Sequence, residues 1–427
     1  MELKPGLSSV LASTIIVFIA SFSVVHASNQ DTSKAGDPEL ADGSLSDRQT
    51  LTGDWGGSRS QLNEKGVGFS LELTEYYQGM FSGTGDDNFD DGGRLDSLIN
   101  LDTEKLGLWN GGGIHFHLTY RYGDLTGFRG GALSPVSVGS VLPLDKKDEL
   151  TASSVYLSQR IGNKGSLLLG KINAIDLLAN DPFFGGWGNH RFMNLSLVAP
   201  PSGVFPPVIM GAIYNHRIDP YTLTFMVYDP EDRTSDSTDD LFSDGATLSF
   251  GVTWAGKISG RASSINVTGI YSDKERVDIT ESLLPPENQS RTKDDSYNIS
   301  LKVSHLLLES PTAPGKGLGI YGKAAAADGN PNIIYTSFKG GLAGHRIVPG
   351  RPDDSFGIGY YYINFSNDLQ DTLAPVGKFE NEQGVEVFYN FAIAPWIVIA
   401  ADIQWIDPSN GDNDDAWIGA LRANLKL

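Results

Sequence analysis

The chain of 427 residues contains no cysteine. Disulfide bonds, thiolate metal sites and cysteine nucleophiles are therefore excluded. Positive charge is also scarce: 32 Lys and Arg stand against 52 Asp and Glu, which gives a formal net charge of −20. This balance argues against nucleic acid as a partner, because phosphates need a basic face. Beyond the N-terminus the sequence has no apolar run long enough for a transmembrane helix, and helical periodicity is nearly absent.

The N-terminal residues have the pattern of an export signal. Lys4 gives a weak positive start, an apolar run extends to Val25, and a small residue, Ala27, completes an acceptable cleavage site. We therefore predict a removed signal peptide over residues 1–27. A transmembrane anchor is the alternative, but the run is short of the roughly 20 residues that a span needs. Residues 28–50 are polar and of low complexity, and we expect them to form a disordered linker.

Apolar and polar residues alternate along most of the remaining chain. In residues 114–122, Ile, Phe, Leu and Tyr alternate with polar residues that include His115, His117 and Arg121. Residues 396–427 contain two further stretches of the same kind. A period of two places the apolar side chains on one face of a strand and the polar ones on the other. With weaker segments included, the pattern predicts about 16 strands of roughly ten residues, the length that a tilted strand needs to cross a bilayer.

The fold predicted from this pattern is all-β, a transmembrane antiparallel β-barrel of about 16 strands over residues 67–427. The apolar face of the sheet would contact lipid, and its polar face would line a lumen. A barrel of this size is wide enough for an aqueous channel. Tight turns alternate with long acidic loops such as residues 83–93, as in outer-membrane barrels. Residues 51–66 suit a short helical segment ahead of the first strand. It would be a plug or a periplasmic cap, or a helix that only shields the end of the barrel.

Several ordered motifs carry a family resemblance. They are GDWGG at 53–57, GKINAID at 170–176, DSFGIGYY at 354–361, EVFYN at 386–390 and GALR at 419–422. Together, over residues 51–427, they resemble the OprB-type carbohydrate-selective porins. The resemblance implies a 16-stranded, multi-pass sugar porin in the outer membrane of a Gram-negative bacterium. It further implies surrounding lipid and lipopolysaccharide, insertion by the barrel-assembly machinery, and a homotrimer as one assembly. The chain ends in Leu427, where this family usually ends in phenylalanine.

A sugar channel needs particular side chains. Charged or amide groups can hydrogen-bond to hydroxyls, an aromatic surface can contact C–H faces, and binding must be weak enough for release. Two kinds of position qualify: polar residues on the lumen face of strands, and the long insert from 173 to 207, which we expect to fold into the lumen. The candidate channel-lining residues are Glu72, Asp96, His115, His117, Arg121, Glu386, Asp402, Gln404 and Arg422 on strands, with Asp176, Trp187, Arg191 and Asn194 in the insert. For any one lumen charge, ordinary wetting of a polar interior is the alternative.

Other functions have weaker support in the sequence. It contains no G-x-S-x-G, H-E-x-x-H or P-loop motif, so we expect no catalytic site and no cofactor. His115 and His117 share a strand face, but no third metal ligand is evident, so we expect no metal site. An outer-membrane barrel enzyme and a closed structural or adhesive barrel remain the alternatives. The number of strands favours a channel, because such barrels tend to be narrower and packed inside.

Overall fold

The computed structural model describes residues 44–144, 147–179, 181–183, 186, 188–199, 205–235, 238–310 and 313–427. Within this part of the chain, sixteen strands close into one antiparallel barrel in the order β1-β18-β17-β16-β15-β14-β13-β12-β9-β8-β7-β6-β5-β4-β3-β2. The predicted all-β barrel of about 16 strands is therefore confirmed. The predicted signal peptide (1–27) and the first part of the predicted linker (28–43) lie outside the described residues.

The bounds of the elements match the predicted strand lengths. The barrel strands are β1 (Val67–Ser82), β2 (Asp90–Asp102), β3 (Gly112–Gly123), β4 (Leu150–Ile161), β5 (Gly165–Asn173), β6 (Val208–Ile218), β7 (Tyr221–Tyr228), β8 (Thr247–Ile258), β9 (Arg261–Ser272), β12 (Ser296–Ser310), β13 (Ala313–Ala327), β14 (Ile334–His345), β15 (Ser355–Phe365), β16 (Glu382–Ala394), β17 (Ile397–Asp407) and β18 (Ala416–Lys426). A small hairpin pairs β10 (Arg276–Val277) with β11 (Thr292–Lys293). The α-helices are α2 (Ser58–Glu64), α3 (Val138–Val141), α4 (Ala174–Leu178), α5 (Leu195–Val198) and α6 (Asn367–Leu373). None of the described helices is long and apolar enough to cross a membrane.

Alternation along each strand separates an apolar outer face from a polar lumen face. On β18, Leu421 is 55% exposed, whereas its neighbour Arg422 is 2% exposed. The same change occurs on β9, where Val267 is exposed and Asn266 is buried. Several side chains of the lumen face, such as Arg422, contact segments inside the barrel. The predicted alternation therefore separates side chains that face lipid from side chains that face the lumen.

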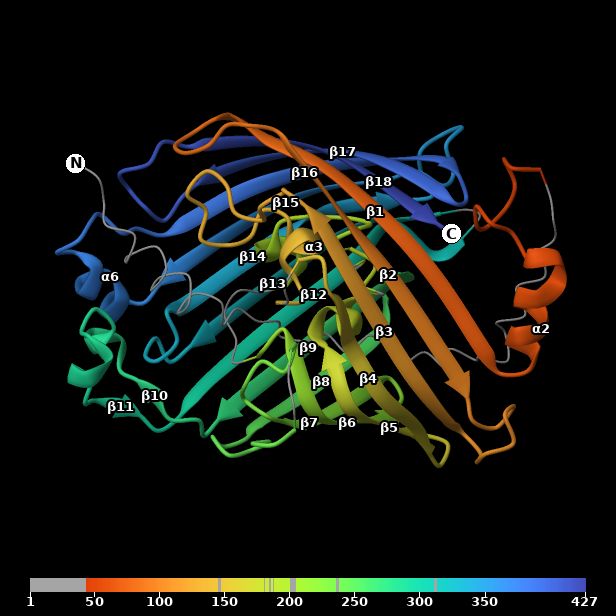
Figure 1. Cartoon of the computed structure of the whole chain (residues 1–427), viewed down its shortest axis with the longest axis horizontal. Helices are drawn as coiled ribbons and strands as arrows, with labels where there is room; N and C mark the ends of the chain where they lie inside the picture. Colours follow the sequence, from red (N-terminus) through yellow and green to blue (C-terminus); the bar gives the residue numbers. More distant parts are fainter. Residues whose placement is uncertain are drawn as a thin grey trace.

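The two ends of the barrel differ in their connections. Tight turns at residues 162–164, 259–260 and 395–396 join strands at one end, and loops such as 83–89 and 229–246 join them at the other. Helix α2 and the C-terminus lie at the end with the tight turns (Figure 1). In outer-membrane barrels the short turns are periplasmic and the long loops extracellular. This rule orients every strand of the barrel.

The predicted helical segment is present at the periplasmic rim. Arg59 on α2 donates a hydrogen bond from Nη2 to the backbone oxygen of Leu427 at 2.8 Å, and its guanidinium lies over the Trp55 ring. The Trp55 ring in turn packs against Phe69 at the start of β1. Because Phe69 is on the outer face of β1, the segment lies beside the rim rather than inside the lumen. Its role as a cap stays a prediction.

Cysteine labelling tests the assignment of faces in the middle of β12. Val303 is 42% exposed on the outer face, and Ser304 points into the lumen. We expect Ser304→Cys to react with a water-soluble maleimide, because it faces an aqueous lumen. A fluorophore on Val303→Cys should instead be quenched by nitroxide-labelled lipid. If the two positions exchanged these properties, the register of the barrel would be wrong by one residue.

Candidate functional site

Two of the extracellular connections fold back into the lumen. Residues 124–149, between β3 and β4, are called insert A here, and residues 174–207, between β5 and β6, insert B. Helix α3 of insert A lies inside the ring of strands (Figure 1). The inward folding of insert B was predicted from its length. That of insert A was not.

The inserts bind one another and share an apolar core. The backbone N–H of Val138 in insert A donates to the oxygen of Met193 in insert B at 2.8 Å. In return, the N–H of Leu195 donates to the oxygen of Pro135 at 2.8 Å. Fully buried apolar residues from both inserts pack in one cluster with side chains of the barrel wall, among them Phe388. The two inserts therefore form one packed body, called the wedge below.

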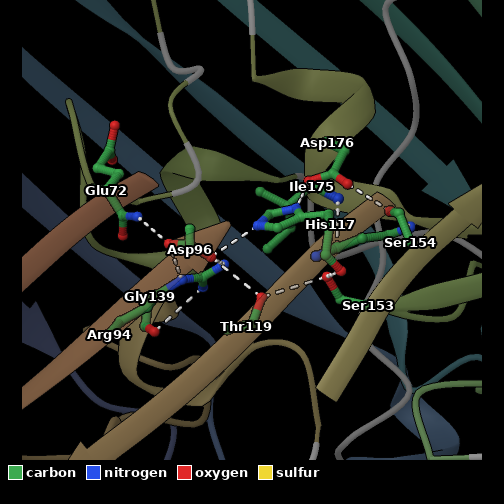
Figure 2. Close-up of polar contacts among 12 residues, drawn as sticks. Glu72, Arg94, Asp96, His117, Thr119, Gly139, Ser153, Ser154, Ile175 and Asp176 are labelled. Carbon is green, nitrogen blue, oxygen red and sulfur yellow. Dashed lines mark hydrogen bonds and ion pairs between the residues drawn. The ribbon is translucent and has the colours of Figure 1, made fainter. Parts of the chain in front are cut away.

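A buried chain of ion pairs joins the wedge to β2 and β3. The Arg94 guanidinium donates two hydrogen bonds of 2.7 Å to Asp96 and a third to the backbone oxygen of Leu142 in insert A. The His117 ring bridges Asp96 and Asp176 of insert B, at 2.8 Å on each side (Figure 2). Arg94, Asp96 and His117 are at most 1% exposed. Burial of these charges is tolerable because each is paired and hydrogen-bonded.

Helix α5 of insert B is held by β16 and β17. The Glu386 carboxylate accepts hydrogen bonds from the backbone N–H groups of Met193, at 2.5 Å, and Asn194, at 3.0 Å. The Asn194 side chain caps α5 by accepting from the N–H of Ser196, and its amide donates to Gln404 at 3.2 Å. Asn residues are preferred at this capping position. The sequence of insert B therefore specifies both where α5 begins and where it is attached.

Arginine and glutamine side chains hold further backbone oxygens of the wedge. Arg422 on β18 donates to the oxygens of Gly188 and Arg191, each at 2.9 Å. Gln404 on β17 donates to the oxygen of Val136 in insert A at 2.9 Å. Guanidinium and amide groups suit this task because they present N–H donors to carbonyl groups that no helix or strand satisfies.

Glu72 and Arg121 contact the wedge at its sides. The Glu72 carboxylate pairs with His190 of insert B at 2.9 Å and accepts from the amide of Asn424 at 2.7 Å. Arg121 is 5% exposed and donates to the backbone oxygen of Ser140 in insert A at 2.5 Å. Both side chains therefore contact protein atoms rather than only solvent.

The structure brings most of the predicted residues together. One group contains Asp96, His117 and Asp176, and a second contains Asn194, Glu386, Asp402, Gln404 and Arg422, in which Asp402 accepts from Gln404 at 3.1 Å. Two predicted residues lie elsewhere, and a third cannot be placed. His115 lies nearer the periplasmic end, the Arg191 side chain donates to the backbone oxygen of Asp181 in insert B, and Trp187 is outside the described residues. Burial lowers the pKa of the Arg191 guanidinium, and the nearby Asp181 carboxylate opposes this change. That these residues contact solute stays a prediction.

Sequence reasoning missed some of the residues that build this site. Arg94 stands two positions before Asp96 on the same strand face, so the alternation itself could have identified it. Tyr76, whose hydroxyl donates to Asn189 of insert B at 2.5 Å, likewise stands two positions after Thr74 on the lumen face of β1. Insert A could have been found from the long gap between two well-marked strands.

Replacement of Glu386 tests how the wedge is held. Glu386→Ala leaves two buried N–H groups without an acceptor, a cost of about 1–3 kcal/mol for each. We expect insert B to become mobile, with more frequent current fluctuations in single-channel recordings and faster protease cleavage in residues 188–199. Glu386→Gln keeps one acceptor oxygen and should have a smaller effect. Glu380→Ala, at an extracellular loop, is the matched control. Glu386→Ala channels with the current fluctuations and protease resistance of the parent would show that Glu386 does not hold insert B.

Comparisons with known proteins agree with this geometry. Residues 87–427 match the family described as carbohydrate-selective porin, OprB family. The chain is 23% identical to the putative porin QuiX of Acinetobacter baylyi, covering 89% of this chain and 94% of that protein. It is 22% identical to Porin B of Pseudomonas aeruginosa, covering 88% of this chain and 90% of that protein. A structure of Pseudomonas putida OprB at high pH aligns with a TM-score of 0.77 at 17% identity, over 90% of this chain and 99% of that one.

The family match covers most of the chain and includes β2, β3 and β16–β18, which hold the wedge. The structural alignment shows the same barrel fold in a solved porin. Fold and family point to a channel rather than an enzyme, located in the outer membrane. This chain belongs to the OprB family of porins.

Proposed function

We propose that this porin passes neutral carbohydrates by selective diffusion. The observation that carries the proposal is a stretch of lumen wall without charged side chains. It comprises the lumen-facing residues of β7, of residues 247–255 in β8, of β9, and of residues 296–300 in β12, and is called the hydroxyl wall. Its polar members are Thr222, Thr224, Thr247, Ser249, Thr253, Ser264, Asn266, Thr268, Ser272, Ser296, Asn298 and Ser300.

Side chains of the hydroxyl wall hydrogen-bond to one another across strands. The Asn266 amide donates to Thr253 Oγ1 at 3.0 Å, and Thr268 Oγ1 donates to Asn266 Oδ1 at 3.0 Å. Thr224 donates to Asn215 on β6 at 2.8 Å. Hydroxyl and amide groups both donate and accept, so they can exchange these bonds for bonds to sugar hydroxyls. Such a surface offers hydrogen bonds without favouring either sign of charge.

The hydroxyl wall lies across the barrel from the charged one. In the closed order of strands, β9 stands opposite β1. Many bonds to the wedge come from β1–β3 and β16–β18, where many of the lumen carboxylates and guanidinium groups lie. Lys302 on β12 and Lys339 on β14 add bonds to Asp181 and to the backbone oxygen of Leu197. The solute path that we propose therefore runs between the wedge and the hydroxyl wall. The charged groups mainly set the position of the wedge. The polar groups of the hydroxyl wall, apart from Ser264, are at most 8% exposed, so a solute would contact them by displacing their mutual hydrogen bonds.

The direct test is a comparison of solutes in planar bilayers. Purified protein should form channels whose ion current is reduced reversibly by neutral sugars. An amino acid zwitterion of similar mass should have little effect, since it lacks the array of hydroxyls. Equal responses to both solutes, or none to sugars, would refute carbohydrate selectivity while leaving the porin assignment intact.

Asn266 is the residue of the hydroxyl wall with which this proposal is tested. Asn266→Leu removes an amide that bonds to two neighbouring hydroxyls and presents an apolar surface to the lumen. We expect apparent sugar affinity to fall by about fivefold, the effect of one lost hydrogen bond of about 1 kcal/mol. Ion conductance should change much less. Val267→Leu, one residue away on the outer face, is the matched control. Sugar block unchanged in Asn266→Leu would show that the solute path lies elsewhere.

A further inference from the structure

A second polar and aromatic group lines the lumen on the periplasmic side of the wedge. It consists of Asn100 on β2, His115 on β3, and Tyr156 and Ser158 on β4, and is called the exit platform. His115 is directly opposite both Asn100 and Tyr156 in the strand register. On β3 it is one lumen-facing position below His117, which binds the wedge. These residues therefore face the lumen between the wedge and its periplasmic end.

Hydrogen bonds fix the His115 ring from both sides. Nδ1 lies 2.7 Å from Oδ1 of Asn100, and Nε2 lies 2.7 Å from Oγ of Ser158. Because a carboxamide oxygen only accepts, Nδ1 must donate to it. The Ser158 hydroxyl can then donate to Nε2, and this arrangement corresponds to a neutral imidazole. The ring is therefore held in one orientation, and a neutral imidazole satisfies both of its hydrogen bonds.

The two rings of the platform stack. The centroids of His115 and Tyr156 are 4.6 Å apart, and their planes differ by 20°. A methyl group on Gly113 would come within 2.8 Å of His115 Nε2, so the imidazole occupies space that only glycine leaves open at that position. The absence of a side chain at Gly113 thus lets the His115 ring lie along the wall beside Tyr156.

Two polar groups of the platform remain available for a solute. Asn100 is exposed and Tyr156 is half-buried. Neither Nδ2 of Asn100 nor the hydroxyl of Tyr156 hydrogen-bonds to any described residue, whereas the other polar atoms of the platform are bonded to one another. A pair of stacked rings flanked by an amide donor and a phenol hydroxyl matches the chemistry of a sugar ring, which has apolar C–H faces and a rim of hydroxyls.

We propose that the exit platform is a binding site for one ring of a neutral sugar on the periplasmic side of the wedge. This inference rests on the proposed carbohydrate function and adds a second site to it. The aromatic surface contacts the C–H face, while Asn100 donates to ring hydroxyls and Tyr156 donates or accepts. With few polar contacts the site binds weakly, and weak binding allows release into the periplasm.

The test uses the full-length porin inserted in one orientation in a planar bilayer, with glucose added to the periplasmic side. Tyr156→Ala should weaken block from this side by about fivefold, the effect of one lost aromatic contact. Tyr156→Phe keeps the ring and should lose only part of the affinity. Asn100→Ala tests the amide donor separately and should also weaken block. Tyr214→Ala is the matched control, because Tyr214 on β6 also has a histidine partner, His216 at 3.0 Å, but on the outer face.

The possible outcomes distinguish a failure of the platform proposal from a failure of the proposed carbohydrate selectivity. Block of the parent channel that is weakened by Tyr156→Ala and Asn100→Ala, but not by Tyr214→Ala, supports the platform. Block of the parent that persists unchanged in Tyr156→Ala and Asn100→Ala overturns the platform and leaves carbohydrate selectivity in place. Absence of sugar block in the parent overturns both. Retained barrel mobility on unheated gels confirms that each variant folds, and the Tyr156→Phe channel decides the question if Tyr156→Ala does not fold.

Discussion

The closed ladder of backbone hydrogen bonds is the constraint on which the rest of this structure depends. Lipid offers no partner for a peptide N–H or C=O, so a strand in the membrane must be paired on both sides. Pairing of β1 with β18 meets this demand by joining the two ends of the sheet. Closure also creates the lumen, and it places the polar face of every strand around a common space. The wedge, the hydroxyl wall and the exit platform all lie in that space.

Charge in the lumen mainly determines the shape of the path. Arg94, Asp96 and His117 are almost fully buried, and their bonds run to the inserts. Glu386 and Arg422 hold backbone groups of insert B in the same way. Buried ion pairs contribute little net stability, but the removal of one partner is costly. Such pairs therefore favour one position of the wedge over others, and a channel that discriminates by size and shape needs a fixed wedge.

Neutral groups are concentrated where solute is proposed to pass. The hydroxyl wall presents Thr, Ser and Asn side chains, and the exit platform presents a neutral imidazole, a phenol and an amide. This separation would explain how an acidic chain can pass the neutral solute that we propose. The carboxylates of the lumen are paired with the wedge or with neighbouring side chains, and many of the others lie on extracellular loops.

The sequence by itself determined the type of fold and the face on which each strand residue lies. Alternation in residues 114–122 fixes the orientation of His115 and His117, because the period of two is a local property of a strand. It could not show that His117 would be buried between Asp96 and Asp176 while His115 stays half-buried on a stacked Tyr156. That difference depends on insert B, which begins more than fifty residues later and packs above one histidine and not the other. Contacts between segments distant in sequence carry no periodic signal, so only the tertiary structure decided which polar residues build the wedge and which remain open to the lumen.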